Sequence, residues 1–205
     1  MPYKKIIPWL LALMLASYAV LTGCQSPTVK VETPSGSGAA DLTRNSCYSL
    51  LHQLLDEEKD VSILRFIKHE NSDVKDLTKK IAAASGAGSK LLEEFAKDDP
   101  AISLDDIRLP LGEVATRATI SASKKEELLS QKGNEFEMTL LLSQTEALNY
   151  AWHLAKVGGE NDSQPDRARA LAGVSDDMKN LYREAVALLL SKAKLTAMDG
   201  VAIQK

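Results

Sequence analysis

The sequence predicts an all-α protein, built as an up-and-down four-helix bundle with one extra short helix between the second and third long helices. Residues 74–95 repeat apolar or small side chains at alternating spacings of three and four, a pattern that a strand cannot produce. Aromatic residues make up only 5% of the chain against 44% hydrophobic residues, with much Leu and Ala, which disfavours a β sandwich. The periodic segments are joined by brief connections, as is typical of helical bundles.

The first 23 residues have the pattern of an export signal. Lys4 and Lys5 precede an uncharged, mostly apolar run from residue 6 to residue 20. That run is shorter than the roughly 20 residues that a helix needs to cross a bilayer. The pattern therefore indicates a signal peptide.

The export signal ends in Leu21-Thr22-Gly23-Cys24. This ending resembles the lipobox of bacterial lipoproteins, in which an apolar residue and two small ones precede a cysteine that accepts a diacylglycerol. The resemblance implies cleavage before Cys24 and a membrane anchor of two or three acyl chains, since each buried CH₂ contributes about 0.8 kcal/mol. Gln25, where Asp would imply inner-membrane retention, implies the outer membrane, facing the periplasm, in a Gram-negative cell. The alternative is an ordinary secretory signal with an unrelated cysteine.

Composition divides the chain into a signal peptide (1–23), a flexible tether (24–40), a helical bundle domain (41–195) and a frayed tail (196–205). The tether is crowded with Pro, Gly, Ser and Thr and has no apolar periodicity, so it cannot bury enough surface to become ordered. Its length keeps the domain close to the membrane.

Five helices are expected in the domain, at about 42–69, 73–97, 111–131, 134–157 and from 165 onward. Pro100 ends the second, because the residue before a proline disfavours the helical conformation. Gly133 stops the third, Asn134 caps the fourth, and Gly158-Gly159 ends it. Pro165 opens the last, where a missing N–H does no harm. That last helix is continuous, or is split near Gly173.

The second helix carries the clearest apolar repeat, formed by Val74, Leu77, Ile81, Ala84, Gly88, Leu91 and Phe95. Its middle, residues 82–89, holds only Ala, Ser and Gly, although each interior glycine costs a helix roughly 1 kcal/mol relative to alanine. Three explanations are open: a neighbouring helix approaches closely there, the helix bends, or the segment is a loop.

Three polar residues are candidates for a functional site. Glu58 falls in the middle of the apolar face of the first helix, where a carboxylate must be paired or protonated. It is either an ion-pair partner of Arg65 or of another arginine, or an inward metal ligand. Glu146 and His153 lie two turns apart on one side of the fourth helix, as possible ligands or as part of a solvent-facing surface.

Patterns typical of catalysis are missing from the sequence. A di-metal bundle needs Glu-x-x-His pairs, and none of His52, His69 and His153 follows a glutamate by three residues. Once Cys24 is acylated, Cys47 is the one remaining thiol, so we expect no intramolecular disulfide. The net charge of −3 argues against nucleic-acid binding. We therefore expect no enzyme activity, no cofactor and no metal.

The order of features over residues 42–192 resembles an exported bacterial ferritin-like family of unknown function. The parallel includes the Leu109-Pro110 loop, the segment Gly133-Asn134-Glu135-Phe136-Glu137 and a last helix with Tyr182-Arg183-Glu184-Ala185. The resemblance implies a ferritin-like bundle. Typical members carry an Asp-His pair in the second helix, where this chain has Ala84-Ser85-Gly86-Ala87, so their metal residues do not carry over.

Two classes of function follow from these observations. The first is a lipid-anchored cell-envelope module with an interaction or structural role and an envelope protein as its partner. The second is a ferritin-like bundle that binds a metal or a small ligand through Glu58, Glu146 or His153.

The lipid anchor is directly testable. Cys24→Ser removes the nucleophile that would receive the diacylglycerol, so we expect an unprocessed precursor or a soluble protein without lipid. Labelling with radioactive palmitate measures this, and label that still enters the variant would refute the anchor.

Overall fold

The computed structural model describes residues 37–60, 71–105, 107 and 109–202. Contacts divide the chain into units 1–34 and 35–205, and every described residue belongs to the second. The described residues form helices and no strand, which confirms the all-α class. The five helices are α2 (Ser37–Glu58), α4 (Ser72–Asp98), α5 (Leu111–Ser130), α6 (Gly133–Glu160) and α7 (Pro165–Ala202).

Several features predicted from the sequence lie outside the described residues, among them the signal peptide, Cys24 and Arg65. Helix α2 begins at Ser37, inside the segment expected to be a tether, and α7 extends to Ala202, past the expected start of the tail. Among the described helices, none combines the length and the apolar character that a membrane span requires.

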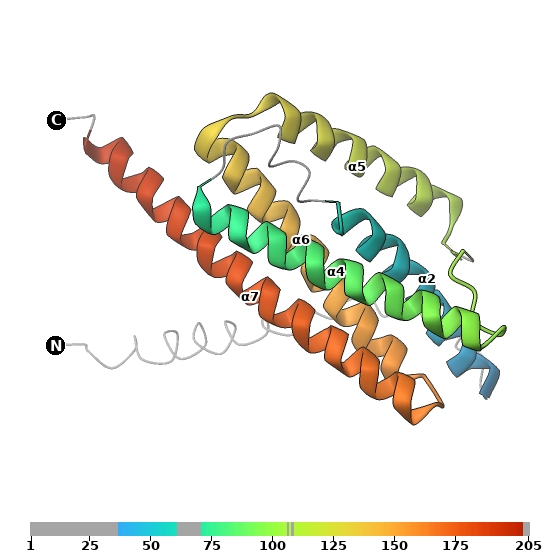
Figure 1. Ribbon diagram of the computed structural model, residues 1–205. Coiled ribbons are helices and arrows are strands. Elements are labelled where there is room, and N and C mark those ends of the chain that lie inside the picture. Colours follow the sequence, from blue (N-terminus) through green and yellow to red (C-terminus); the bar gives the residue numbers. More distant parts are fainter. Residues whose placement is uncertain (1–36, 61–70, 106, 108, 203–205) are drawn as a thin grey trace, which may run out of the picture. The chain divides into compact units, whose positions relative to one another are not determined.

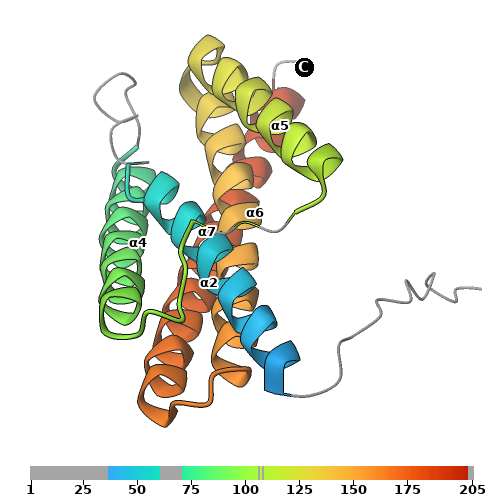
Figure 2. The ribbon, with the colours of Figure 1, turned by 90° about the vertical axis from the view of Figure 1, so that its right-hand side faces the viewer.

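Four of the helices make a closed ring of contacts, in which α2 and α7 each pack on both α4 and α6 (Figures 1 and 2). Helix α5 packs chiefly on α6 and lies outside this ring (Figure 2). The core fills the space between the four ring helices. Its largest fully buried side chains are Tyr48, Leu51, Leu55, Val74, Ile81, Leu92, Phe136, Leu140, Leu141, Leu148, Leu171 and Met178.

The apolar repeat of α4 is correct in its first half and partly displaced by one residue in its second half. Val74, Leu77, Ile81 and Gly88 are buried as predicted, but Ser85 and Leu92 are buried rather than Ala84 and Leu91. A straight α-helix has 3.6 residues per turn, so a repeat of 3.5 drifts around its surface. The face that meets the core therefore moves to later positions.

The small residues of α4 mark a close approach between helices. The helix is continuous through residues 82–89, so the loop explanation was wrong. A Cβ atom at Gly88 would lie 2.8 Å from Leu55 Cδ1 on α2 and 3.6 Å from Val174 Cγ1 on α7. Glycine at this position lets three helices meet.

The predicted end of the fourth helix was also wrong, because α6 continues through Gly158 and Gly159 to Glu160. A Cβ atom at Gly158 would lie 3.2 Å from Tyr48 Cε1 and 3.3 Å from Cys47 Cβ. This glycine serves close packing against α2 and does not stop the helix.

The expected start of α6 differs in detail from the structure, whereas the expected start of α7 is confirmed. The N-cap of α6 is Lys132 rather than Asn134, and Gly133 has a φ of +57°, a conformation that favours glycine. Pro165 opens α7 as predicted, and α7 runs through Gly173 without a break.

A buried polar network joins the helices at one end of the domain. The Tyr48 hydroxyl donates to Asp162 Oδ2 at 2.5 Å, and Arg167 donates to both oxygens of Asp162 at 2.7 and 2.9 Å. Arg167 Nη1 also donates to Asp99 at 2.9 Å, just after α4. Burial raises the pKa of Asp162, but hydrogen bonds from Arg167 and Tyr48 lower it further, so the net pKa lies below its usual value.

A second buried polar group joins α4, α6 and α7 nearer the other end. Glu137 on α6 and Lys192 on α7 are both buried, and their charged groups lie 2.7 Å apart. Glu137 also accepts hydrogen bonds from the backbone N–H and the side-chain amide of Asn71, at 2.6 and 2.9 Å. The carboxylate is thereby fully paired, as a buried charge must be.

The approach at Gly88 predicts that Gly88→Leu overpacks the core. Leu55 is fully buried and has little room to move, so we expect a loss of stability of about 1–3 kcal/mol. Thermal unfolding followed by circular dichroism measures the loss. The matched control is Gly173→Leu on α7, where a new Cβ meets nothing within 4 Å. Equal melting temperatures for the two variants would contradict the close approach.

Candidate ligand-binding site

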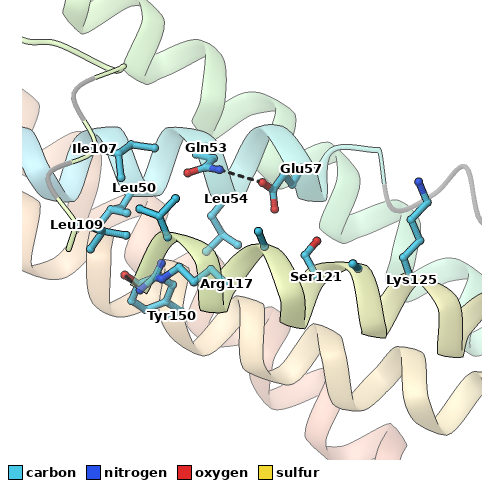
Figure 3. A pocket seen from close by; sticks show the side chains of 13 residues that line it. Leu50, Gln53, Leu54, Glu57, Ile107, Leu109, Arg117, Ser121, Lys125 and Tyr150 are labelled. Atoms are coloured by element: carbon cyan, nitrogen blue, oxygen red, sulfur yellow. Dashed lines mark hydrogen bonds between the residues drawn. The ribbon is translucent and has the colours of Figure 1, made fainter. Parts of the chain in front are cut away.

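A cavity lies between α5 and the pair formed by α2 and α6. It consists of two adjoining pockets of about 690 and 740 Å³, which share the lining residues Leu54, Glu57, Arg117, Ser121, Lys125 and Tyr150. Figure 3 shows the first pocket, with Leu54 of α2 facing Arg117 and Ser121 of α5 and with Tyr150 of α6 at one end. Side chains from three helices that are distant in sequence therefore enclose one space.

The packing of α5 explains why this space exists. None of the residues of α5 is buried, and Leu111, Val114, Ile120 and Leu129 are exposed. The α5 side chains that face α2 include Ala118, Ser121 and Ala122, which are spaced along one helix face. These side chains are too short to fill the gap to α2, so α5 covers the other helices without interlocking with them.

Glu58 is the buried acid of this cavity and lines its second pocket. The residue as a whole is partly exposed, but its Oε2 is buried and has no hydrogen-bond partner within the described part of the chain. Burial raises the pKa of Glu58 to about 7, against the lowering effects of a hydrogen bond from Gln144 and of the charge of Lys124. Arg65, its expected partner, lies outside the described residues.

Gln144 on α6 supplies the second polar group of the same pocket. It is only 3% exposed, and the interaction of its side chain with the Glu58 carboxyl lowers the pKa of that acid. Its Oε1 is buried and, among the described residues, has no partner. Two residues that line the pocket thus each have a buried acceptor oxygen, Glu58 Oε2 and Gln144 Oε1, that lacks a donor among the described residues. Each such atom costs about 1–3 kcal/mol when it is left unsatisfied.

Glu146 lines the same pocket as Glu58, so the structure brings two of the three predicted residues together. Its carboxylate is more than half exposed and forms an ion pair with Lys124 of α5. It therefore stands at the edge of the cavity and closes α5 onto α6, with little net energy expected from an exposed pair.

His153 does not belong to the cavity. It lies on the exposed side of α6, where Nδ1 is 2.8 Å from the carbonyl oxygen of Asn149 and the ring centroid is 4.3 Å from that of Trp152. Its neighbours along α6, Glu146 and Lys156, are exposed as well. Of the two interpretations offered by the sequence, a ligand or part of a solvent-facing surface, the second describes the position of His153.

The cationic side chains at the cavity are largely paired. Arg117 Nε lies 2.7 Å from Glu113 Oε1, and its Nη2 donates to the Tyr150 hydroxyl at 3.1 Å. Its guanidinium also lies 5.1 Å from the centroid of the Tyr150 ring, within the range of a cation–π contact. Arg117 thus fixes α5 to α6 rather than pointing free into the cavity.

A group of metal-binding residue types was missed by the sequence analysis. Single ligand atoms of His52, Asp56 and Glu93 all lie within 4.8 Å of one another. His52 and Asp56 are four residues apart on α2, a spacing that could have been noticed, but Glu93 joins them only because α4 packs on α2. Asp56 already forms an ion pair with Lys59, and the Glu93 side chain is 56% exposed.

Cys47 has no reactive surroundings. It is a buried free cysteine that packs against Gly158, and burial raises its pKa to about 11. A thiol with that pKa is protonated at neutral pH and is a poor nucleophile. Its role is to pack α2 on α6.

No family model, curated protein or solved structure gives a significant match to this chain.

Elemental analysis provides the test for metal. We expect the protein, purified without added metal, to hold less than about one tightly bound transition-metal ion per chain. The reason is that the Asp56 carboxylate already forms an ion pair with Lys59 and that the Glu93 side chain is exposed to solvent. Stoichiometric zinc or iron that disappears in His52→Ala, and persists in the control His153→Ala, would contradict this expectation.

Proposed function

We propose that this chain is a lipid-anchored cell-envelope protein whose helical domain binds a small amphipathic ligand in the cavity between α2, α5 and α6. The lipobox ending at Cys24 supports the anchor, and in a Gram-negative cell Gln25 supports the outer membrane. The observation that carries ligand binding is the pair of buried acceptor oxygens, Glu58 Oε2 and Gln144 Oε1, inside a largely apolar cavity.

The size and lining of the cavity support this proposal. Ligand sites are typically concave spaces of about 300–1,000 Å³, mostly apolar, with a few polar groups that orient the ligand. Each of the two pockets lies in this range, at about 690 and 740 Å³. Leucine and alanine side chains supply the apolar walls, and Glu58 with Gln144 supplies the polar end.

We assign binding rather than catalysis to this cavity. Among the described residues that line it there is no histidine or cysteine beside Glu58 that could act as its partner in proton transfer or as a nucleophile. The ring of α2, α4, α7 and α6 supports a ferritin-like up-and-down bundle with α5 as the extra helix. In this proposal the bundle carries an organic ligand at its side instead of metal ions at its centre.

An interaction role with an envelope protein is the second candidate. It is favoured by the four large apolar side chains that α5 leaves exposed: Leu111, Val114, Ile120 and Leu129. Protein crosslinking in cells that is lost when Leu111 and Leu129, which line neither pocket, become lysine, while ligand binding persists, would favour this second role.

Filling the cavity tests the proposed function. Ser121 lines both pockets, so Ser121→Trp places a large ring in the space between α5 and α2. We expect the mature chain, with Cys24→Ser to avoid detergent, to bind the neutral dye N-phenyl-1-naphthylamine with a rise in fluorescence. Ser121→Trp should weaken this binding at least tenfold.

The matched control is Ser123→Trp, on the same helix, at an exposed position that lines neither pocket. It adds the same ring without filling the cavity. Equal dye binding by both variants, with unchanged circular dichroism spectra, would place the dye elsewhere and contradict the proposal.

A further inference from the structure

Two acceptor oxygens of residues that line the second pocket receive no hydrogen bond from the described part of the chain. Glu58 Oε2 and Gln144 Oε1 are both acceptors, both are buried, and neither has a partner within the described part of the chain. A ligand group that only accepts hydrogen bonds would leave both atoms unsatisfied. A group with several N–H donors would satisfy both atoms at once, and an ammonium group has three.

The charges around Glu58 favour a cation. The basic residues Lys124 and Arg117 are held by Glu146 and Glu113, respectively. Lys125 is the remaining base of the lining.

Against Lys125 stand three acids that line the second pocket, namely Glu57 and Glu58 at the end of α2 and Asp60 in the turn that follows it. Glu57 accepts a hydrogen bond from the neutral amide of Gln53 at 3.2 Å, so its charge is not neutralised by that contact. The lining therefore has an excess of negative charge at the end of α2, beside Glu58. An anion would be repelled there, and a cation would be attracted.

The rest of the pocket suits an apolar body. Leu54 of α2, Ile120 and Leu128 of α5, and Leu140 and Ala147 of α6 line it together with the polar residues. A hydrocarbon chain or ring between these side chains would bury apolar surface away from water, which favours binding.

We propose that the cavity binds an amphipathic primary amine in its ammonium form, with the ammonium between Glu58 Oε2 and Gln144 Oε1 and the apolar body against Leu128 and Leu140. This inference rests on the proposed function and names the ligand class of the same site. The ammonium–carboxylate hydrogen bond is charge-assisted and stronger than a neutral one.

The binding of such an amine depends on pH through Glu58. Burial raises the pKa of Glu58 to about 7, whereas an alkyl amine stays charged near neutral pH, like a lysine. The ammonium pairs with the ionised carboxylate, so binding is tight above pH 7 and weakens as pH falls and Glu58 becomes protonated. From pH 8 to pH 6 the ionised fraction falls about tenfold, and the affinity falls with it.

The other charged groups that face Glu58 do not change this direction. Among the described residues of the pocket lining they are Glu57 on α2, Asp60 just after it, Arg117, Lys124 and Lys125 on α5, and Glu146 on α6. The described lining contains no histidine, the side chain whose ordinary pKa lies in this range.

Isothermal titration calorimetry of three eight-carbon probes provides the test: octylammonium, octanol and octanoate, titrated into the mature Cys24→Ser chain at pH 8. They share one apolar body and differ in the polar group. We expect octylammonium to bind at least tenfold more tightly than octanol and octanoate. In Glu58→Gln, which keeps the shape of the side chain and removes its charge, the preference for octylammonium over octanol should vanish while octanol binding persists.

The matched control is Glu126→Gln, which removes an exposed charge of α5 that lines neither pocket. It should leave the preference for octylammonium within about twofold, because the proposed contact is with Glu58. If Glu58→Gln fails to fold, Gln144→Met removes the second acceptor and should weaken octylammonium several-fold with little effect on octanol.

The outcomes separate this inference from the proposed function. Octanol and octanoate that bind the unaltered site as tightly as octylammonium would overturn the inference and leave ligand binding standing. An ammonium preference that survives in Glu58→Gln would also overturn it. If none of the three probes, and no dye, binds the protein, then the proposed function fails together with the inference.

Discussion

The contact between Tyr48 and Gly158 is the constraint on which the rest of the domain depends. The Tyr48 ring is fully buried and lies where a side chain at residue 158 would otherwise stand, at 3.2 Å from the position of a Cβ atom. This sets the closest approach of α2 to α6. The hydroxyl of the same residue then reaches Asp162, which also holds Arg167. One tyrosine thus fixes the α2–α6 contact and the turn that leads into α7.

The same constraint explains why the cavity forms beside α5. Helices α2 and α6 are held at one end by the Tyr48 network, and the Glu137–Lys192 pair joins α6 to α7 nearer the other. The ring of four helices is therefore complete without α5, which adds no buried residue to the core. Since the ring does not need α5 for its packing, small side chains on α5 leave space without exposing the core. The cavity costs little stability at that place.

The helices were predictable from sequence because apolar periodicity is a local property. The all-α class, the end of α4 before Pro100 and the start of α7 at Pro165 follow from residues near each boundary. The role of Gly158 could not be predicted in this way, since a glycine that ends a helix and a glycine that admits Tyr48 look alike until the partner helix is known. For the same reason the sequence did not show the cavity, which needs side chains from three helices.

The sequence identifies Glu58 as unusual, and the structure shows the surroundings of its carboxyl group. Its position on an apolar face identified it as an anomaly, and the sequence offered an arginine or a metal as its partner. In the structure its carboxylate meets the neutral amide of Gln144 instead, and each residue keeps one acceptor without a donor. A core that served stability alone would gain from replacing both residues by apolar ones, because two unsatisfied oxygens cost about 1–3 kcal/mol each. A ligand with N–H donors would recover that cost on binding, and it would stabilise the folded domain by mass action. We therefore propose that the unsatisfied pair is the polar end of a binding site and not an element of the core.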